Sequence, residues 1–135
     1  MTETKETNEI KTLWQTYLDP MHPSQCAIVE RPVVKTFVTT DTGETFYDIG
    51  ANVFPNEKGE LTSWVPQADL GIGREIKTLN AIVCFRTNEE IARANFRSQM
   101  YEIAREFRKR AQKYLDKADK FFAQGDLYGK AEFDD

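Results

Sequence analysis

The chain has 135 residues, of which 40% are hydrophobic and 30% are charged, and its formal net charge is −4. This length suits one domain that folds without a disulfide framework or a structural metal, and the composition excludes a disordered or membrane-embedded chain. A dedicated duplex-binding domain is usually basic. The net negative charge argues against that class of protein, although a local basic patch is still compatible with it. We therefore expect a single domain over residues 1–135.

The N-terminal segment and the cysteines predict a cytoplasmic protein. Residues 1–9 are polar and charged, so we expect a flexible start and no secretory signal. The longest uncharged apolar run, residues 81–85, is far too short to cross a bilayer. With only Cys26 and Cys84 there is no disulfide framework, and the apolar neighbours of Cys84 predict a buried thiol. No membrane contact is expected.

Residues 10–86 are expected to form a body made of a helix and a sheet. The apolar residues at the start follow helical spacing and predict a short helix that ends at Asp19-Pro20: Ile10, Leu13, Trp14, Tyr17 and Leu18. The aromatic face of this helix, Trp14 and Tyr17, docks on the sheet or meets a partner, and the spacing leaves both alternatives open.

From residue 26 to residue 86 the pattern changes to β. β-branched and aromatic residues predict strands over 33–40, 44–49, 52–54, 61–65 and 76–85. Asp41-Thr42-Gly43 supplies a hairpin turn. Short connections indicate an antiparallel meander of about four strands. The apolar centre of 76–85 predicts a middle position in the sheet.

Residues 87–135 predict a long amphipathic helix followed by a short one. Thr87 and Glu90 form a capping box, no Gly or Pro occurs from 88 to 124, and Gly125 provides a stop. The stretch 118–131 resembles the helix–turn–helix corner of a tetratricopeptide repeat over about fourteen residues, fewer than half of that unit. Any corner in which Gly ends one helix and Asp caps the next explains the same residues. The fold class is α+β.

The apolar residues of the long helix form one stripe. Its members recur at eleven-residue intervals, which suits a straight helix: Phe96, Met100, Ile103, Ala104, Phe107, Ala111, Tyr114, Leu115, Ala118, Phe121 and Phe122. A helix over 89–124 would be about 54 Å long, whereas a compact domain of this size is about 37 Å across. The helix therefore breaks or is covered by a second chain, and the lack of a breaker residue favours the second chain.

The candidates for chemistry are few. His22 and Cys26 could form a nucleophilic pair but need an orienting group, and with Cys84 they do not make a zinc ligand set. Asp41 and Asp48 flank a hairpin and could converge on a metal. The pair Gly71 and Gly73 lacks the third glycine and the following helix of a phosphate loop. We predict no catalytic residue, no cofactor and no metal.

Basic residues concentrate on the long helix. Residues 88–124 contain nine Lys or Arg and six Asp or Glu. Interleaved acids favour a solvated, salt-bridged face. Contact with an acidic partner or a nucleic acid is the alternative, and it would use Arg97, Arg105, Arg108, Arg110 and Lys113.

These patterns predict a non-enzymatic interaction or assembly module. The long helix would self-associate or bind a protein partner through an apolar seam, with two aromatic residues of the first helix as second choices: Phe96, Met100, Phe107, Tyr114, Phe121 and Phe122, then Trp14 and Tyr17. The alternatives are a nucleic-acid-binding accessory protein, an inhibitor of a larger protein machine, and a small enzyme or ligand-binding domain that uses the Gly71–Gly73 loop.

Overall fold

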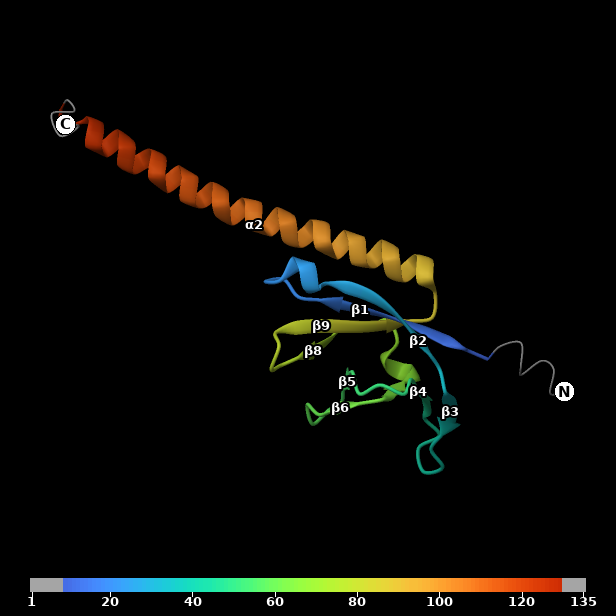
Figure 1. Ribbon diagram of the computed structural model, residues 1–135. Coiled ribbons are helices and arrows are strands. Elements are labelled where there is room, and N and C mark those ends of the chain that lie inside the picture. Colours follow the sequence, from blue (N-terminus) through green and yellow to red (C-terminus); the bar gives the residue numbers. More distant parts are fainter. Residues whose placement is uncertain (1–8, 130–135) are drawn as a thin grey trace. The chain divides into compact units, whose positions relative to one another are not determined.

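The computed structural model describes residues 9–129, and the chain divides into two compact units, Met1–Ser98 and Gln99–Asp135. Figure 1 shows the elements, which are in chain order β1 (Thr12–Leu18), η1 (Pro23–Gln25), β2 (Ala27–Pro32), β3 (Lys35–Val38), β4 (Thr45–Asp48), β5 (Phe54–Pro55), β6 (Leu61–Thr62), β7 (Trp64–Pro66), η2 (Gln67–Asp69), β8 (Arg74–Ile76), β9 (Ala81–Arg86) and α2 (Glu89–Asp126). This is the expected α+β class with antiparallel strands. Within the described chain, no helix combines the length and the apolar character needed to cross a membrane.

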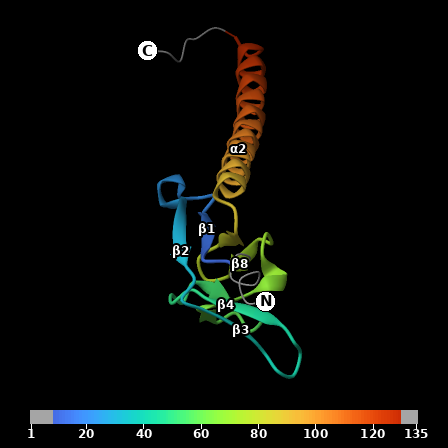
Figure 2. The same ribbon diagram turned by 90° about the vertical axis from the view of Figure 1, so that its right-hand side faces the viewer.

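The segment expected to form an N-terminal helix is instead the strand β1. It pairs with β2 on one side and with β9 on the other, which makes it a central strand (Figure 2). Leu13 and Gln15 are buried on one face, and Thr16 and Leu18 are buried on the other. A strand with two covered faces carries apolar residues at both odd and even positions, and the helical spacing arose from that arrangement.

The strands form three antiparallel sheets rather than one meander of about four strands. Their orders are β2-β1-β9-β8, β3-β4-β7 and β5-β6. The turn at Asp41-Thr42-Gly43 is confirmed, since Gly43 has a φ of +73° and its N–H donates to the Thr39 carbonyl at 2.9 Å. In the sheet β2-β1-β9-β8, β1 pairs with β9, which lies far along the chain. Short connections between neighbouring strands cannot predict such a pairing.

The expected strand 76–85 is split into a hairpin. Its turn, at 77–80, joins β8 to β9 and contains Asn80 at a φ of +56°, a left-handed conformation that Asn tolerates better than most residues. β9 lies between β1 and β8, so the predicted middle position is confirmed for this half. Cys84 is buried, as expected.

One apolar core holds the sheets of the first unit together. Its buried members come from all three sheets and the loop after β4: Leu13, Tyr47, Ile49, Phe54, Val65, Ile76, Val83 and Phe85. The rings of Phe54 and Phe85 lie 5.8 Å apart between centroids, and the Arg74 guanidinium lies over the Phe54 ring at 5.5 Å. Aromatic contacts of this kind tie the small β5-β6 sheet to β8 and β9.

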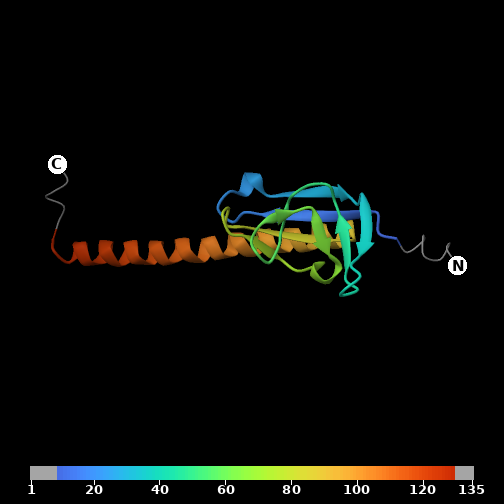
Figure 3. The same ribbon diagram turned by 90° about the horizontal axis from the view of Figure 1, so that it is seen from below.

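The helix α2 is continuous over 38 residues, a length of about 57 Å, and Figure 3 shows it without a break. Its cap is Asn88, whose Oδ1 accepts the Ile91 N–H at 2.9 Å, rather than the expected pair of Thr87 and Glu90. The helix passes through Gly125 and ends at Asp126. The expected stop at Gly125 is therefore wrong, and residues 127–129, where the expected short C-terminal helix would begin, form a turn and no helix. The rest of that expected helix lies on residues 130–135, outside the described residues.

Truncation of the Phe85 side chain tests the core. Phe85→Ala removes a side chain that is 1% exposed and should lower the free energy of unfolding by about 3–5 kcal/mol. Urea denaturation followed by tryptophan fluorescence measures it. Val38→Ala, at a side chain that is 57% exposed, is the control and should change it little. A loss for Phe85→Ala as small as that of the control would contradict this core.

Candidate functional site

The most prominent apolar surface of the second unit is one face of α2. We call it the α2 stripe and define it by seven residues, Phe107, Ala111, Tyr114, Leu115, Ala118, Phe121 and Phe122. All are exposed, and the exposed fraction is 72% for Tyr114, 75% for Phe121 and 72% for Phe122. At 100° per residue they share one side of the helix. Contiguous exposed apolar surface of this kind is rare on folded monomeric proteins.

The predicted seam residues differ in exposure along the helix. Phe96 and Met100 are partly buried, whereas Phe107 is 42% exposed and the later seam residues are more exposed. Trp14 and Tyr17, expected to share a helix face, lie three positions apart on β1 and therefore on its opposite faces. Tyr17 packs against the core of the first unit. The structure therefore brings the later seam residues together on one face, and it separates Trp14 from Tyr17.

The charged side chains of α2 lie beside and behind the stripe. Lys109 and Glu106 form an ion pair at 3.5 Å, and Gln112 donates to Asp116 at 2.9 Å. The Arg110 guanidinium lies over the Phe107 ring at 5.6 Å. The five predicted anion contacts are all exposed: Arg97, Arg105, Arg108, Arg110 and Lys113. The basic residues are thus interleaved with acids, as the sequence predicts for a solvated face.

A second apolar surface lies on the sheet β3-β4-β7 of the first unit. Phe37 pairs with Phe46, and Phe46 pairs with Pro66, so these side chains form one row across the outer face. The Phe37 ring stacks on Phe46 at 5.5 Å and meets Trp64 edge-on at 5.2 Å. Trp64 remains 51% exposed. Sequence reasoning missed this surface, although Phe46 beside the buried Tyr47 was a usable signal in β4.

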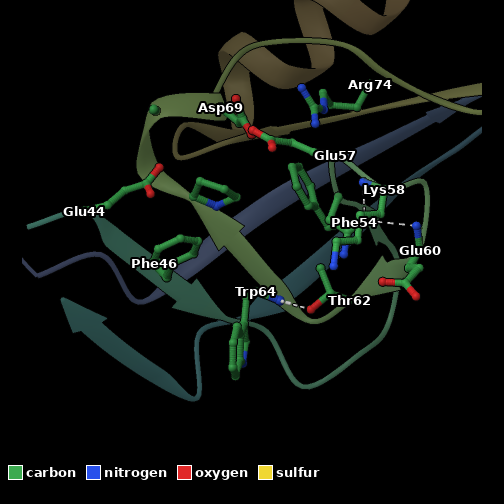
Figure 4. Close-up of a pocket in the computed structure, with 13 residues that line it drawn as sticks. Glu44, Phe46, Phe54, Glu57, Lys58, Glu60, Thr62, Trp64, Asp69 and Arg74 are labelled. Carbon is green, nitrogen blue, oxygen red and sulfur yellow. Dashed lines mark hydrogen bonds between the residues drawn. The ribbon is translucent and has the colours of Figure 1, made fainter. Parts of the chain in front are cut away.

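A hollow of about 570 Å³ adjoins this aromatic row (Figure 4). Its lining contains four acidic side chains (Glu44, Glu57, Glu60 and Asp69), two basic ones (Lys58 and Arg74) and three aromatic ones (Phe46, Phe54 and Trp64). Many of these residues are themselves exposed, so the hollow is open to solvent. Its size is within the range of ligand sites, but such sites usually enclose most of their ligand.

The loop between β1 and β2 brings His22 and Cys26 to Asp19, His22 to its carboxylate and Cys26 to its main chain. The His22 Nδ1 lies 3.0 Å from Asp19 Oδ2, and Asp19 Oδ1 accepts the Met21 N–H at 3.0 Å. The Cys26 thiol, however, donates to the Asp19 carbonyl at 3.4 Å and accepts the Asp19 N–H at 3.3 Å. Because main-chain groups hold the thiol, we interpret this cluster as one that stabilises the turn between β1 and β2.

The electrostatics of Asp19 fit that structural role. Burial alone would raise the pKa of this carboxyl. Hydrogen bonds from the Met21 N–H and the His22 ring, together with the charge of His22, outweigh burial, and the pKa lies below its ordinary value of 3.8. The ionised form is therefore the one that stabilises the loop.

The remaining candidates serve local structure. Gly71 has a φ of +81°, and its N–H donates to the Phe85 carbonyl at 2.7 Å. A Cβ on Gly73 would lie 3.1 Å from the Ile82 side chain, so this glycine allows close packing. Asp41 Oδ1 and Asp48 Oδ1 accept main-chain N–H groups at 2.9 Å within their own turns. Gly73 also borders a hollow of about 300 Å³ whose walls include no large apolar side chain.

Among residues 9–129, no cluster of three or more His, Cys, Asp or Glu side chains is arranged to hold a metal ion. Comparison of the chain with models of protein families, with curated proteins and with solved structures finds no match.

Replacement of Asp19 tests the loop. Because the folded pKa of Asp19 lies below 3.8, its contribution to stability is full above the ordinary pKa and is lost as the pH falls through the folded pKa. Asp19→Asn should lower the free energy of unfolding at pH 7, and the gap to the wild type should close on acidification. Urea titrations from pH 7 to pH 2 measure it, with Glu30→Gln, at an exposed residue, as the control. A gap independent of pH would contradict this role.

Proposed function

We propose that this chain is a non-enzymatic interaction or assembly module that binds protein through the α2 stripe. The observation that carries this proposal is the exposure of large apolar side chains, 58% for Leu115 and 72–75% for Tyr114, Phe121 and Phe122, along one face of an unbroken helix. In proteins, most helical stability comes from packing of the apolar face. A partner on the stripe would supply that packing for the outer turns of α2.

The apolar character of the stripe also indicates the class of partner. Its aromatic residues are large and rigid, and residues of this type dominate the buried centres of protein interfaces. Charged residues flank the stripe without entering it, as expected for the rim of such an interface. A protein surface with an apolar centre fits both features.

Charged substitutions within the stripe test this function. Phe107→Glu combined with Tyr114→Glu should abolish association and leave a folded monomer of 15.6 kDa, because two charges would be desolvated in the interface. Size-exclusion chromatography with light scattering, at micromolar concentration and near-physiological salt, measures the mass, and circular dichroism checks the fold.

Lys109→Glu is the matched control for this experiment. It changes the net charge by the same amount as the double variant, at a position about 180° from the centre of the stripe, and it should leave association intact. A double variant that associates like the wild type would contradict the proposal. Loss of the folded state in the double variant would show that Phe107 and Tyr114 are core residues.

Nucleic-acid binding is a second candidate function, favoured by the exposed basic residues between Arg105 and Lys113. Binding through phosphate contacts weakens steeply as salt increases. If this candidate is correct, filters should retain RNA or DNA with the protein at low salt, and Arg105→Glu with Arg108→Glu should abolish retention. Absence of retention at low salt would exclude it.

A further inference from the structure

We propose that the partner of the α2 stripe is a second copy of this chain, packed antiparallel to the first about a two-fold axis between Gln112 and Lys113. This inference rests on the proposed function and adds the identity, direction and register of the partner. Two observations carry it, the order of large and small residues in the stripe and the apolar area that it offers, and the charges along its edges provide the test.

Large and small side chains complement each other in this register. A two-fold axis between Gln112 and Lys113 places Phe107 level with Ala118 of the second copy, and Ala111 level with Tyr114. It also places Ala104 level with Phe121. Each pair occurs twice, so a bulky ring faces a methyl group at these three levels, whereas Phe122 lies level with Ile103 and Leu115 lies level with Arg110. Alternation of large and small residues across facing positions fills an interface without voids.

A register about the midpoint of Tyr114 and Leu115 is less favourable. It would set Phe107 against Phe122 and Ala111 against Ala118 of the second copy. The facing phenylalanine rings would hold the two helices apart, and the facing alanines would then leave gaps between them. Such gaps lose contact energy on both sides, so the register about Gln112 and Lys113 is preferred.

The charges on one edge of the stripe distinguish an antiparallel pair from a parallel one. At 100° per residue, Arg108 and Asp119 lie about 80° and about 100° from the centre of the stripe, both on the Leu115 side. In an antiparallel pair each edge meets the same edge of the other copy. Arg108 is then offset by two residues, about 3 Å, from Asp119 of the second copy. Within residues 9–129 neither side chain forms an ion pair, so both charges are available across the interface.

A parallel pair makes different contacts. Each edge of the stripe would then meet the opposite edge, which carries Glu106, Arg110 and Lys117. Asp119 would lie near Lys117 of the second copy, and Arg108 would lie between Glu106 and Arg110. The two directions can therefore be separated by exchange of Arg108 and Asp119.

The exposed area suits a dimer. The large side chains of the stripe are 42–75% exposed, which corresponds to on the order of 600 Å² per copy, because an aromatic side chain offers about 150–250 Å². Two copies together would bury about 1,200 Å², the lower end of the range for stable interfaces. An association in the micromolar range is consistent with an interface of this size.

A charge exchange across the interface tests the antiparallel register. Arg108→Asp places two Asp residues near each other across the interface, and Asp119→Arg places two Arg residues there. Each single variant should raise the dissociation constant of the dimer about tenfold. The double variant Arg108→Asp/Asp119→Arg restores opposite charges and should return the constant to near the wild-type value. Sedimentation equilibrium at low ionic strength measures all four proteins.

Lys109→Asp is the matched control, because it changes the charge as Arg108→Asp does, about 180° away from the stripe centre. It should leave the dissociation constant within about twofold. A double variant as weak as the single variants overturns the antiparallel register, as do unaffected single variants or a wild-type trimer. Those results leave the proposed function standing if association still depends on Phe107 and Tyr114. A monomeric wild type overturns the second copy as the partner and leaves the proposed function to a different protein on the stripe.

Discussion

The exposure of the α2 stripe follows from a constraint of helix geometry. Side chains of a straight helix stay on the face where the sequence places them, and the α2 stripe occupies one face of a helix that runs unbroken to Asp126. Its own backbone cannot turn back to cover it. Burial of apolar surface stabilises by roughly 25 cal/mol per Å², so a stripe of several aromatic residues favours association over exposure. Only another packed surface removes this apolar area from water.

The first unit covers the apolar side chains of its core with its own residues. β1 lies between β2 and β9 and has both faces covered, and the core joins residues of three small sheets. Its polar interior is also satisfied: Arg31 donates to Gln15 at 2.7 Å, and Thr16 donates to the Cys84 carbonyl at 3.4 Å. The contrast between a body with satisfied interior groups and a helix with an open stripe points to α2 as the interaction element.

Local signals in the sequence predicted the elements that depend on local interactions. The spacing of apolar residues predicted the long helix α2, and turn chemistry predicted the turn at Asp41-Thr42-Gly43. Apolar content predicted the middle position of β9. The structure contains all three. The direct cap came from Asn88 rather than Thr87, an error of one residue. The stripe could be named from the sequence because its residues share a face once a helix is assumed.

The errors arose where distant segments decide the outcome. Residues 12–18 have helical spacing, but pairing with β9, near the end of the first unit, makes them a strand. Tertiary pairing of this kind overrides local propensity. The aromatic row of Phe37, Phe46 and Trp64 was missed for a related reason, because its members come from three strands and meet only through the register of the sheet.

Amide hydrogen exchange along α2 reports whether the α2 stripe is covered in solution. Exchange should be measured for residues 99–126 at two protein concentrations that differ roughly hundredfold. If a second copy covers the stripe, these amides should be protected at the higher concentration and should exchange faster on dilution, while β1 and β9 stay protected at both. Protection of α2 that is the same at both concentrations, or absent from both, would contradict the account.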